Sequence, residues 1–284
     1  AAVAFALLAV AWILYPLAMW LRARGDRLGS TPVTDHKERV VVLVATRDDP
    51  AFALERVRNL RAGDYPPHLL RVLLAVDVNA PYALDAYRAA LSGSADVVGG
   101  DAPGGKAATL NAAVRAAGSS DVLVFADVGQ EFSAGAIPHL VAALRDERVG
   151  AVTGRYTHGR HDEIMSAYAD FEALIRSGQA AGRSVVSASG SILAMRPSLW
   201  RDLPAGLICD DLFTGLSVVR QGSRVGFCRE AVAYDPREFN RDQQFTRRVR
   251  TLTGLIQYCV VQPRAQLPWS NPVCSHFMGQ KVLC

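Results

Sequence analysis

The residues of this chain that are best able to do chemistry are charged residues at the ends of apolar segments. Asp127 ends the segment 121–127, in which a run of apolar residues rich in Val and Phe predicts a strand buried on both faces. Ligands of open α/β sheets bind outside the carboxyl ends of the strands, so Asp127 is placed to meet a ligand or to hold a cation. The alternative is that Asp127 only caps the following turn.

A glycine-rich segment over 100–105 precedes Lys106, at the expected start of a helix. The segment differs from a nucleotide-binding P-loop at position 107, where Ala replaces the Ser or Thr that would hold magnesium, and this disfavours an ATPase. A lysine and free backbone N–H groups at a helix start still suit a diphosphate. A lysine that only faces solvent in a turn is the alternative.

Asp210 and Asp211 are adjacent acids between apolar residues, at a second expected helix start. Side chains of adjacent helical residues diverge, so the two carboxyl groups are not expected to share one proton. One of them can cap the helix. The other can act as a general base that takes the proton of an attacking hydroxyl.

Arg247 and Arg248 lie near the start of an amphipathic segment, 241–260. Arginine pairs bidentately with phosphate, so these side chains can neutralise a leaving diphosphate. The alternative is a basic helix face that rests on anionic lipid.

The elements that must position these residues alternate between strands and helices. Apolar runs predict strands at 39–45, 70–76, 96–98 and 121–127, with a helix after each of the first three. This rhythm predicts βαβ units and a mostly parallel sheet flanked by helices.

Composition narrows the class of protein. Half of the 284 residues are hydrophobic, which allows a sizeable core. The net charge of +4 comes without a long basic run, so a nucleic-acid partner is not expected. The five cysteines form no C-x-x-C pair, which favours a reducing compartment.

The first 21 residues carry no charge and are almost wholly apolar, and arginines follow them. A helix of this length spans roughly 30 Å, the thickness of a bilayer's hydrocarbon core. We therefore expect a transmembrane anchor over 1–24, a polar linker over 25–38, and a cytoplasmic catalytic domain at the inner membrane. A cleaved signal peptide and a buried helix of a soluble domain are the alternatives.

Taken in chain order, these segments resemble the motifs of the family 2 glycosyltransferases, which have a GT-A fold. The resemblance runs from about Arg39 to Gln262, and it is to the membrane-anchored branch related to cellulose, hyaluronan and poly-N-acetylglucosamine synthases. The most specific match is the segment 105–111, Gly-Lys-Ala-Ala-Thr-Leu-Asn, which corresponds to the family's Gly-Lys and Leu-Asn pairs. Asp127 corresponds to the first acid of the family's Asp-x-Asp metal motif.

The resemblance implies a role for each matched residue. The donor, a nucleoside-diphosphate sugar and preferably a UDP-sugar, would be bound by Asp49, Asp77, Lys106, Asn111, Gln244, Arg247 and Arg248. The acceptor, a lipid or glycan hydroxyl, would lie against Ser189, Gly190 and Ser191. Asp127 would hold a divalent cation, Mg²⁺ or Mn²⁺, and Asp211, beside Asp210, would be the catalytic base.

The implied fold is an α/β, GT-A-like doubly wound sheet, with an N-terminal transmembrane helix and a C-terminal amphipathic interface helix. The catalytic domain would cover 39–240, divided into a nucleotide-binding half (39–130) and an acceptor half (131–240). Residues 241–284 would form the interface helix and the run-up to further membrane helices. The implied activity is inverting sugar transfer for cell-envelope or extracellular polysaccharide or glycolipid synthesis.

Two positions depart from the family pattern. Gly129 replaces the second acid of the Asp-x-Asp motif, and Arg248 replaces the tryptophan of the processive synthases. These departures keep a second hypothesis open, in which the chain is a catalytically impaired, nucleotide-sugar-binding or scaffold protein.

Overall fold

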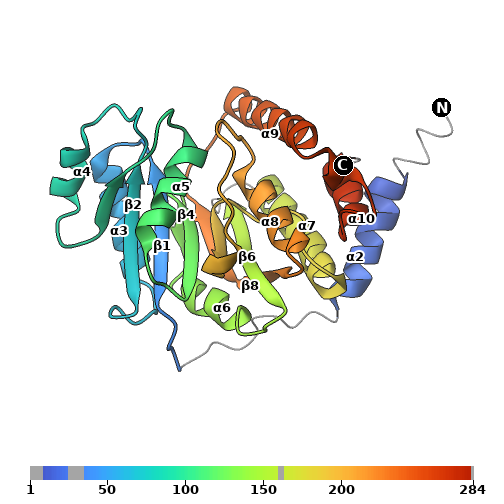
Figure 1. The fold of residues 1–284 in the computed structure, drawn as a ribbon. Helices are drawn as coiled ribbons and strands as arrows, with labels where there is room; N and C mark the ends of the chain where they lie inside the picture. The colour runs from blue at the N-terminus through green and yellow to red at the C-terminus, as the bar shows by residue number, and fades with distance from the viewer. Residues whose placement is uncertain (1–8, 25–34, 159–162, 283–284) are drawn as a thin grey trace.

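The computed structural model describes residues 9–24, 35–158 and 163–282, which fold around an eight-stranded sheet (Figure 1). The strand order across the sheet is β3-β2-β1-β4-β7-β6-β8-β5. The strands are β1 (Val40–Thr46), β2 (Leu70–Val76), β3 (Asp96–Gly99), β4 (Val122–Asp127), β5 (Glu131–Phe132), β6 (Val149–His158), β7 (Ile192–Met195) and β8 (Arg224–Asp235).

The sheet has a parallel half and a mixed half. Strands β3, β2, β1 and β4 are parallel neighbours, as the βαβ rhythm predicts. Beyond β4, the short strand β7 runs antiparallel to both β4 and β6, whereas β6 and β8 are parallel. The carboxyl ends of β1 and β4 therefore lie side by side at one edge of the sheet, next to the start of β7.

The apolar strands form because both faces of the sheet are covered. In β1, Val41 and Leu43 pack into one hydrophobic cluster, whereas Val40, Val42 and Val44 pack into the cluster on the opposite face. Alternate residues of a strand point to opposite faces, so a continuous run of valines satisfies two cores at once.

Helices form the two outer layers. Buried residues of α3 (Pro50–Arg61), α4 (Leu84–Ala90) and α6 (Ala136–Ala143) belong to one cluster. Buried residues of α5 (Lys106–Ala117), α7 (Glu163–Gly182) and α8 (Asp210–Arg220) belong to the other. The remaining elements are η1 (Val10–Leu14), α2 (Tyr15–Ala23), η2 (Pro197–Leu199), α9 (Arg241–Val261), η3 (Pro263–Gln266), α10 (Cys274–Phe277) and η4 (Met278–Val282).

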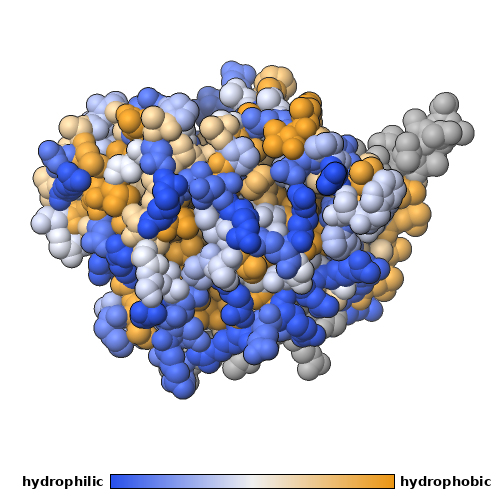
Figure 2. Space-filling view, in the orientation of Figure 1, coloured by the Kyte–Doolittle hydropathy of each residue, from blue (hydrophilic) through white to orange (hydrophobic). Residues whose placement is uncertain are grey.

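Helix α9 crosses one end of the molecule above α8 (Figure 1). It rests on the domain through Gly254 and the buried Tyr258, and a Cβ at position 254 would lie 2.4 Å from Sγ of Cys209. The glycine is thus needed for this close approach. The apolar stripe that the sequence shows on this helix, which includes Phe245 and Ile256, is exposed, and hydrophobic surface gathers over α9 in Figure 2.

The prediction of a transmembrane anchor over 1–24 is wrong. Within the described residues, the structure contains no helix with the length and apolar character that a membrane span requires. The helical stretch from Val10 to Ala23 extends about 21 Å, which is short of a bilayer's hydrocarbon core. The same finding overturns the predicted inner-membrane location, which depended on this helix. Residues 1–8 of the anchor and 25–34 of the linker lie outside the described residues.

Helix α2 instead packs against α7, at the end of the molecule away from α3 and α4 (Figure 1). Gly178 of α7 makes the contact possible, because a Cβ there would lie 2.3 Å from the carbonyl oxygen of Met19. Nε2 of Gln179 donates a hydrogen bond of 2.7 Å to the hydroxyl of Tyr15. The rings of Tyr15 and His276 also make an edge contact. The pKa of His276 falls to about 4 because of burial and the nearby arginines.

We expect Gly178→Ala to lower the free energy of unfolding by roughly 1–3 kcal/mol, because the added methyl group collides with the backbone of α2. Gly182→Ala is the matched control, since its Cβ would meet only the flexible side chain of Arg22 at 3.3 Å. Urea unfolding of both variants measures the difference. Equal stability of the two variants would contradict close packing of α2 on α7.

Candidate active site

The candidate site is centred on Lys106, at the first turn of α5. Its Nζ lies 2.8 Å from Oδ1 of Asp127, at the end of β4, and 3.1 Å from Oδ2 of Asp210, at the start of α8. Three segments that are distant in the sequence thus meet at one ammonium group. The structure brings together the lysine and the acids that the sequence singles out.

The titration of the central groups reflects this crowding of charge. Burial acts to lower the pKa of Lys106, but the charges of Asp127 and Asp210 outweigh it, so the pKa is raised. Burial raises the pKa of Asp210, and the charge of Asp211 adds to the effect, while Lys106 opposes it. Lys106 is therefore a permanent cation whose charge holds neighbouring carboxylates in place.

The loop before Lys106 is fixed by Asp77, at the end of β2. Its Oδ2 accepts a 2.8 Å hydrogen bond from the backbone N–H of Gly105, and its Oδ1 accepts one of 2.9 Å from that of Asn79. Gly104 has a φ of +92°, and a Cβ there would lie 2.1 Å from Nδ2 of Asn79. The glycines are thus required for the turn that delivers Lys106 to the site.

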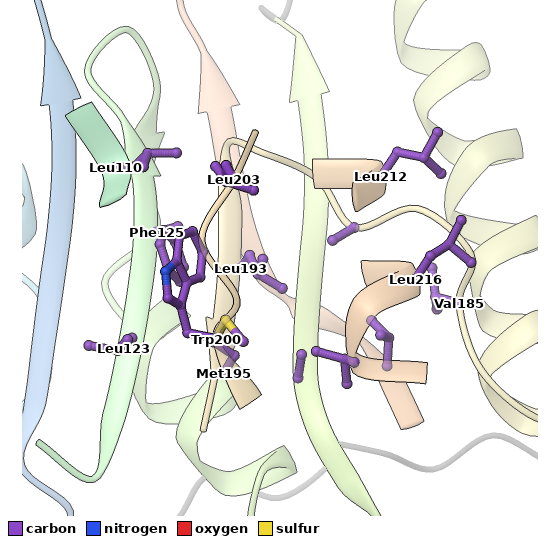
Figure 3. Packing of buried hydrophobic residues seen from close by; sticks show 14 of the residues in the cluster. Leu110, Leu123, Phe125, Val185, Leu193, Met195, Trp200, Leu203, Leu212 and Leu216 are labelled. Carbon is purple, nitrogen blue, oxygen red and sulfur yellow. The ribbon is translucent and has the colours of Figure 1, made fainter. Parts of the chain in front are cut away.

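A small pocket opens beside these charges. Its polar wall is formed by Lys106, Asp127, Asp210, Asp211 and Thr214. Its apolar wall includes Phe125 and Trp200, whose rings stack with centroids 5.0 Å apart and an angle of 16° between their planes. Figure 3 shows this ring pair within the hydrophobic cluster, between Leu110 and Leu193. The charges are therefore backed by rigid packing.

The predicted acceptor loop lies at the same place. Oγ of Ser191 donates a 3.2 Å hydrogen bond to Oδ2 of Asp127. Gly190 lines the pocket, and a Cβ at this position would lie 3.4 Å from Nζ of Lys106 and 3.6 Å from Cβ of Asp211. The backbone N–H of Ser189 is used within the fold, since it donates to Oγ1 of Thr153.

Two predicted donor residues have partners within the protein. The side-chain amide of Asn111 bonds to both backbone groups of Leu203, with each distance 2.9 Å, and so holds the loop before α8. Asp49 caps α3, where its Oδ1 accepts a 2.7 Å hydrogen bond from the N–H of Ala51. The hydrogen bond with Asp49 also raises the pKa of Tyr82. Contact of Asn111 and Asp49 with a sugar donor stays a prediction.

The predicted arginine motif is at the first turns of α9, outside the pocket lining. Nε2 of Gln244 donates to the carbonyl oxygen of Phe239 at 3.1 Å. The guanidinium of Arg247 stacks on the Phe239 ring, with Cζ 4.0 Å from the centroid. Arg248 is exposed, and its charge acts on Tyr168. The two arginines thus face different surroundings.

A group at the end of β8 escaped the sequence analysis. Asp235 is fully buried and accepts hydrogen bonds from Nε2 of Gln130 (3.0 Å) and the hydroxyl of Tyr156 (2.8 Å). Arg237 donates to the same carboxylate through Nε and Nη2, each at 2.8 Å. The guanidinium of Arg237 lies over Gly129, two residues after Asp127. The signal that identified Asp127, an acid at the end of a strand, also applies to Asp235.

Arg56 is a second residue that the sequence analysis did not identify, and it holds the backbone of Asp127. Arg56 of α3 is buried, and its Nε donates a 3.0 Å hydrogen bond to the backbone carbonyl oxygen of Asp127. Burial lowers the pKa of Arg56 to about 9, against the charges of Asp127 and Glu131. The sequence showed no sign of this role, because Arg56 and Asp127 are 71 residues apart in the chain.

The side chains around Asp127 do not form a set of ligands that could hold a divalent cation by themselves. Asp127 is the predicted ligand, but Lys106 and Ser191 already bind its two carboxylate oxygens. The guanidinium of Arg237 takes the space that a second acid at position 129 would need. Among the described residues, His, Cys, Asp and Glu side chains form no group of three that could hold a metal.

Comparisons with known proteins agree on the fold. A family model described as "Glycosyltransferase like family 2" matches residues 37–254. No curated protein sequence matches the chain. The solved mannosyltransferase PcManGT from Pyrobaculum calidifontis, in complex with GDP-Man and Mn²⁺, is similar with a TM-score of 0.77 and 21% identity, over 97% of this chain and 79% of that one.

A second similar structure is S. aureus TarS 1–349 in complex with UDP-GlcNAc. Its TM-score is 0.53 at 11% identity, and the alignment covers 77% of this chain and 66% of that one. The structural similarity shows a common fold, and at identities this low it shows the fold alone. The family match rests on the sequence and covers most of the chain.

Asp235 predicts an acid-sensitive contribution to stability. Burial would raise its pKa, but hydrogen bonds from Arg237, Gln130 and Tyr156 lower it from 3.8 to about 2. A lowered pKa in the folded state stabilises the protein above about pH 4, and this stabilisation is lost as the pH falls toward 2. It is worth about 2 kcal/mol, at 1.36 kcal/mol per unit.

We therefore expect the free energy of unfolding to fall less steeply between pH 5 and pH 2 in Asp235→Asn than in the unmodified protein. The matched control is Asp85→Asn, because Asp85 pairs with Arg88 on the surface with its side chain 87% exposed. Urea unfolding at a series of pH values gives the slopes. A slope for Asp235→Asn equal to that of the control would contradict the assignment.

Proposed function

The chain belongs to the glycosyltransferase-like family 2 and is a glycosyltransferase; from this premise we propose that it transfers a sugar from a nucleoside-diphosphate donor to an acceptor hydroxyl, with inversion at the anomeric carbon. The observation that carries the proposal is the position of Lys106 between Asp127 and Asp210, with Asp211 on the same pocket wall. A cation for the leaving group and a carboxylate for the acceptor thus adjoin one cavity.

The donor would bind at the carboxyl ends of β1 and β4, where sheets of this kind bind ligands. Asp77 and Asp49, which lie at the ends of β2 and β1, would hold the nucleoside, and Lys106 would contact the diphosphate. Both similar structures were solved with a nucleoside-diphosphate sugar, one with GDP-Man and the other with UDP-GlcNAc. We favour a UDP-sugar for this chain.

Departure of the diphosphate is the step that most needs the protein, because negative charge builds up on the leaving oxygen. Lys106 is fixed in place by two carboxylates before the donor arrives, so little reorganisation is needed when the charge develops. The arginines of α9, and Arg247 in particular, would add positive charge at the outer end of the site. These groups stabilise the transition state more than the bound donor.

Asp211 is our choice of base. Asp210 is committed to the ion pair with Lys106, which takes one of its oxygens. Asp211 lines the pocket without such an ion pair among the described residues, and its Oδ1 accepts a 2.8 Å hydrogen bond from the N–H of Leu212. Its second oxygen would take the acceptor's proton as the hydroxyl attacks the anomeric carbon from the far side.

The acceptor would be a lipid or glycan hydroxyl that enters beside Gly190 and Ser191. Gly190 leaves room next to Lys106 and Asp211, where the attacking oxygen has to pass. The product would be a cell-envelope or extracellular polysaccharide or glycolipid.

A second candidate function is a nucleotide-sugar-binding or scaffold protein without turnover. Gly129, where the family pattern has an acid, favours it. The intact arrangement of Lys106, Asp127 and Asp211 supports the enzyme instead, because a binding protein has no need for a base.

We expect UDP or GDP to raise the thermal unfolding temperature of the protein, because the negative diphosphate is attracted to the ammonium group of Lys106. Lys106→Met should abolish most of the shift. ATP serves as the control ligand, and a shift with ATP alone would point to an ATPase. Absence of a shift with every nucleoside diphosphate, in folded protein, would contradict the donor site.

We expect Asp211→Asn to lower sugar transfer by at least a hundredfold and to leave donor affinity within about threefold, because it removes a proton acceptor without altering shape. Asp210→Asn is the matched control, because it removes the same charge from the helix start and leaves Asp211 in place, and it should lower transfer much less than Asp211→Asn does. Transfer is measured with radiolabelled UDP-sugars and binding by calorimetry. Near-normal turnover of Asp211→Asn would rule out this base.

A further inference from the structure

The space beside Asp127 where the family's second acid belongs is filled by an arginine. Gly129 lies two residues after Asp127, so their Cα atoms are at most about 7 Å apart. A Cβ at position 129 would lie 2.4 Å from Nη1 and 2.5 Å from Cζ of Arg237. An aspartate cannot occupy this position unless the guanidinium moves. The glycine and the arginine therefore form one structural unit.

Arg237 is held in this position from behind. Its Nε and Nη2 donate to the two oxygens of Asp235, and its own N–H donates to Oδ1 at 3.1 Å. Asp235 is fully buried and is itself fixed by Gln130 and Tyr156. A side chain held by a buried, hydrogen-bonded carboxylate loses little freedom when it binds a further ligand. The guanidinium is thus preorganised.

The free edge of Arg237 faces Gly129. Nη1 is the atom nearest to the glycine, and among the described residues it donates no hydrogen bond. The side chain is 42% exposed, so a ligand can reach it. The guanidinium groups of Arg237 and Arg247 both lie over the ring of Phe239, with Cζ atoms 5.4 Å and 4.0 Å from its centroid. A second cation, Arg247, therefore contacts the same ring as Arg237.

We propose that Arg237 binds the diphosphate of the donor together with Lys106, in the place where the family pattern has a metal-binding acid, so that this chain binds its donor without a divalent cation. The inference rests on the proposed function, and it identifies the side chains that bind the diphosphate of the donor. Arginine binds phosphate oxygens bidentately, and Nη1 has two N–H groups available for them. Lys106, whose Nζ lies 2.8 Å from Oδ1 of Asp127, supplies the second positive charge.

The test is calorimetric titration of UDP and GDP into the protein, in EDTA and in MnCl₂. We expect the unmodified protein to bind at least one of them in EDTA, with an affinity that Mn²⁺ changes less than threefold. Arg237→Gln should weaken this binding at least tenfold in both buffers. Arg229→Gln, which alters an exposed arginine of β8, is the matched control and should bind as the unmodified protein does.

A double variant tests the exchange of cation for acid directly. Gly129→Asp combined with Arg237→Ser makes room for the second acid, and we expect nucleoside diphosphate to bind to it in MnCl₂ but not in EDTA. Thermal unfolding checks that each variant is folded. If Arg237→Gln is not folded, Arg237→Lys replaces it, and it should bind less tightly than the unmodified protein because a point charge replaces the fork.

The outcomes separate the two claims. Binding by the unmodified protein only in MnCl₂, or undiminished binding by folded Arg237 variants, would overturn the role of Arg237 and leave the proposed function standing. Absence of binding of both diphosphates in both buffers would overturn the donor site and the inference with it.

Discussion

The ion pairs of Lys106 are the interaction on which the site depends. The ammonium group joins the end of β4 to the start of α8, two elements that are distant in the sequence. Asp127, Asp210 and Asp211 would repel one another without a cation between them, because like charges at close range disfavour ionisation. Removing one partner of these partly buried ion pairs leaves the other charge uncompensated, so the lysine is needed for the shape of the site as well as for its chemistry.

Sequence patterns predicted the parallel half of the sheet well, because strands buried on both faces give continuous apolar runs such as Val40–Thr46. The second half was harder to predict. β8 runs on to Asp235, because its register with β6 shifts at an irregularity after Gly154 and pairing then resumes. The N-terminal helix was misassigned because apolarity alone cannot distinguish packing on a protein helix from contact with lipid. The close approach of Met19 to Gly178 appears only in three dimensions.

The central residues of the site were predictable because strand ends and helix starts can be located from apolar periodicity, and Lys106, Asp127 and Asp210 all lie at such points. Asn111 could not be interpreted this way, since its amide bonds to a loop 92 residues further along the chain. The same limit hid Arg237. Its value depends on the absence of a side chain at Gly129, and the sequence showed that glycine only as a departure from a pattern.

The balance of charge explains why a single lysine is insufficient for a diphosphate donor. In the protein by itself, Lys106 already faces the carboxylates of Asp127, Asp210 and Asp211, so the centre of the site carries more negative than positive charge. A diphosphate would add negative charge to a region that already has an excess. Favourable binding therefore requires cations that the carboxylates of the centre have not neutralised. Arg247, which stacks on the Phe239 ring and forms no ion pair among the described residues, would meet this requirement. Arg237 is paired with Asp235, but its guanidinium still presents unused N–H groups toward Gly129, so it contributes directional hydrogen bonds more than net charge.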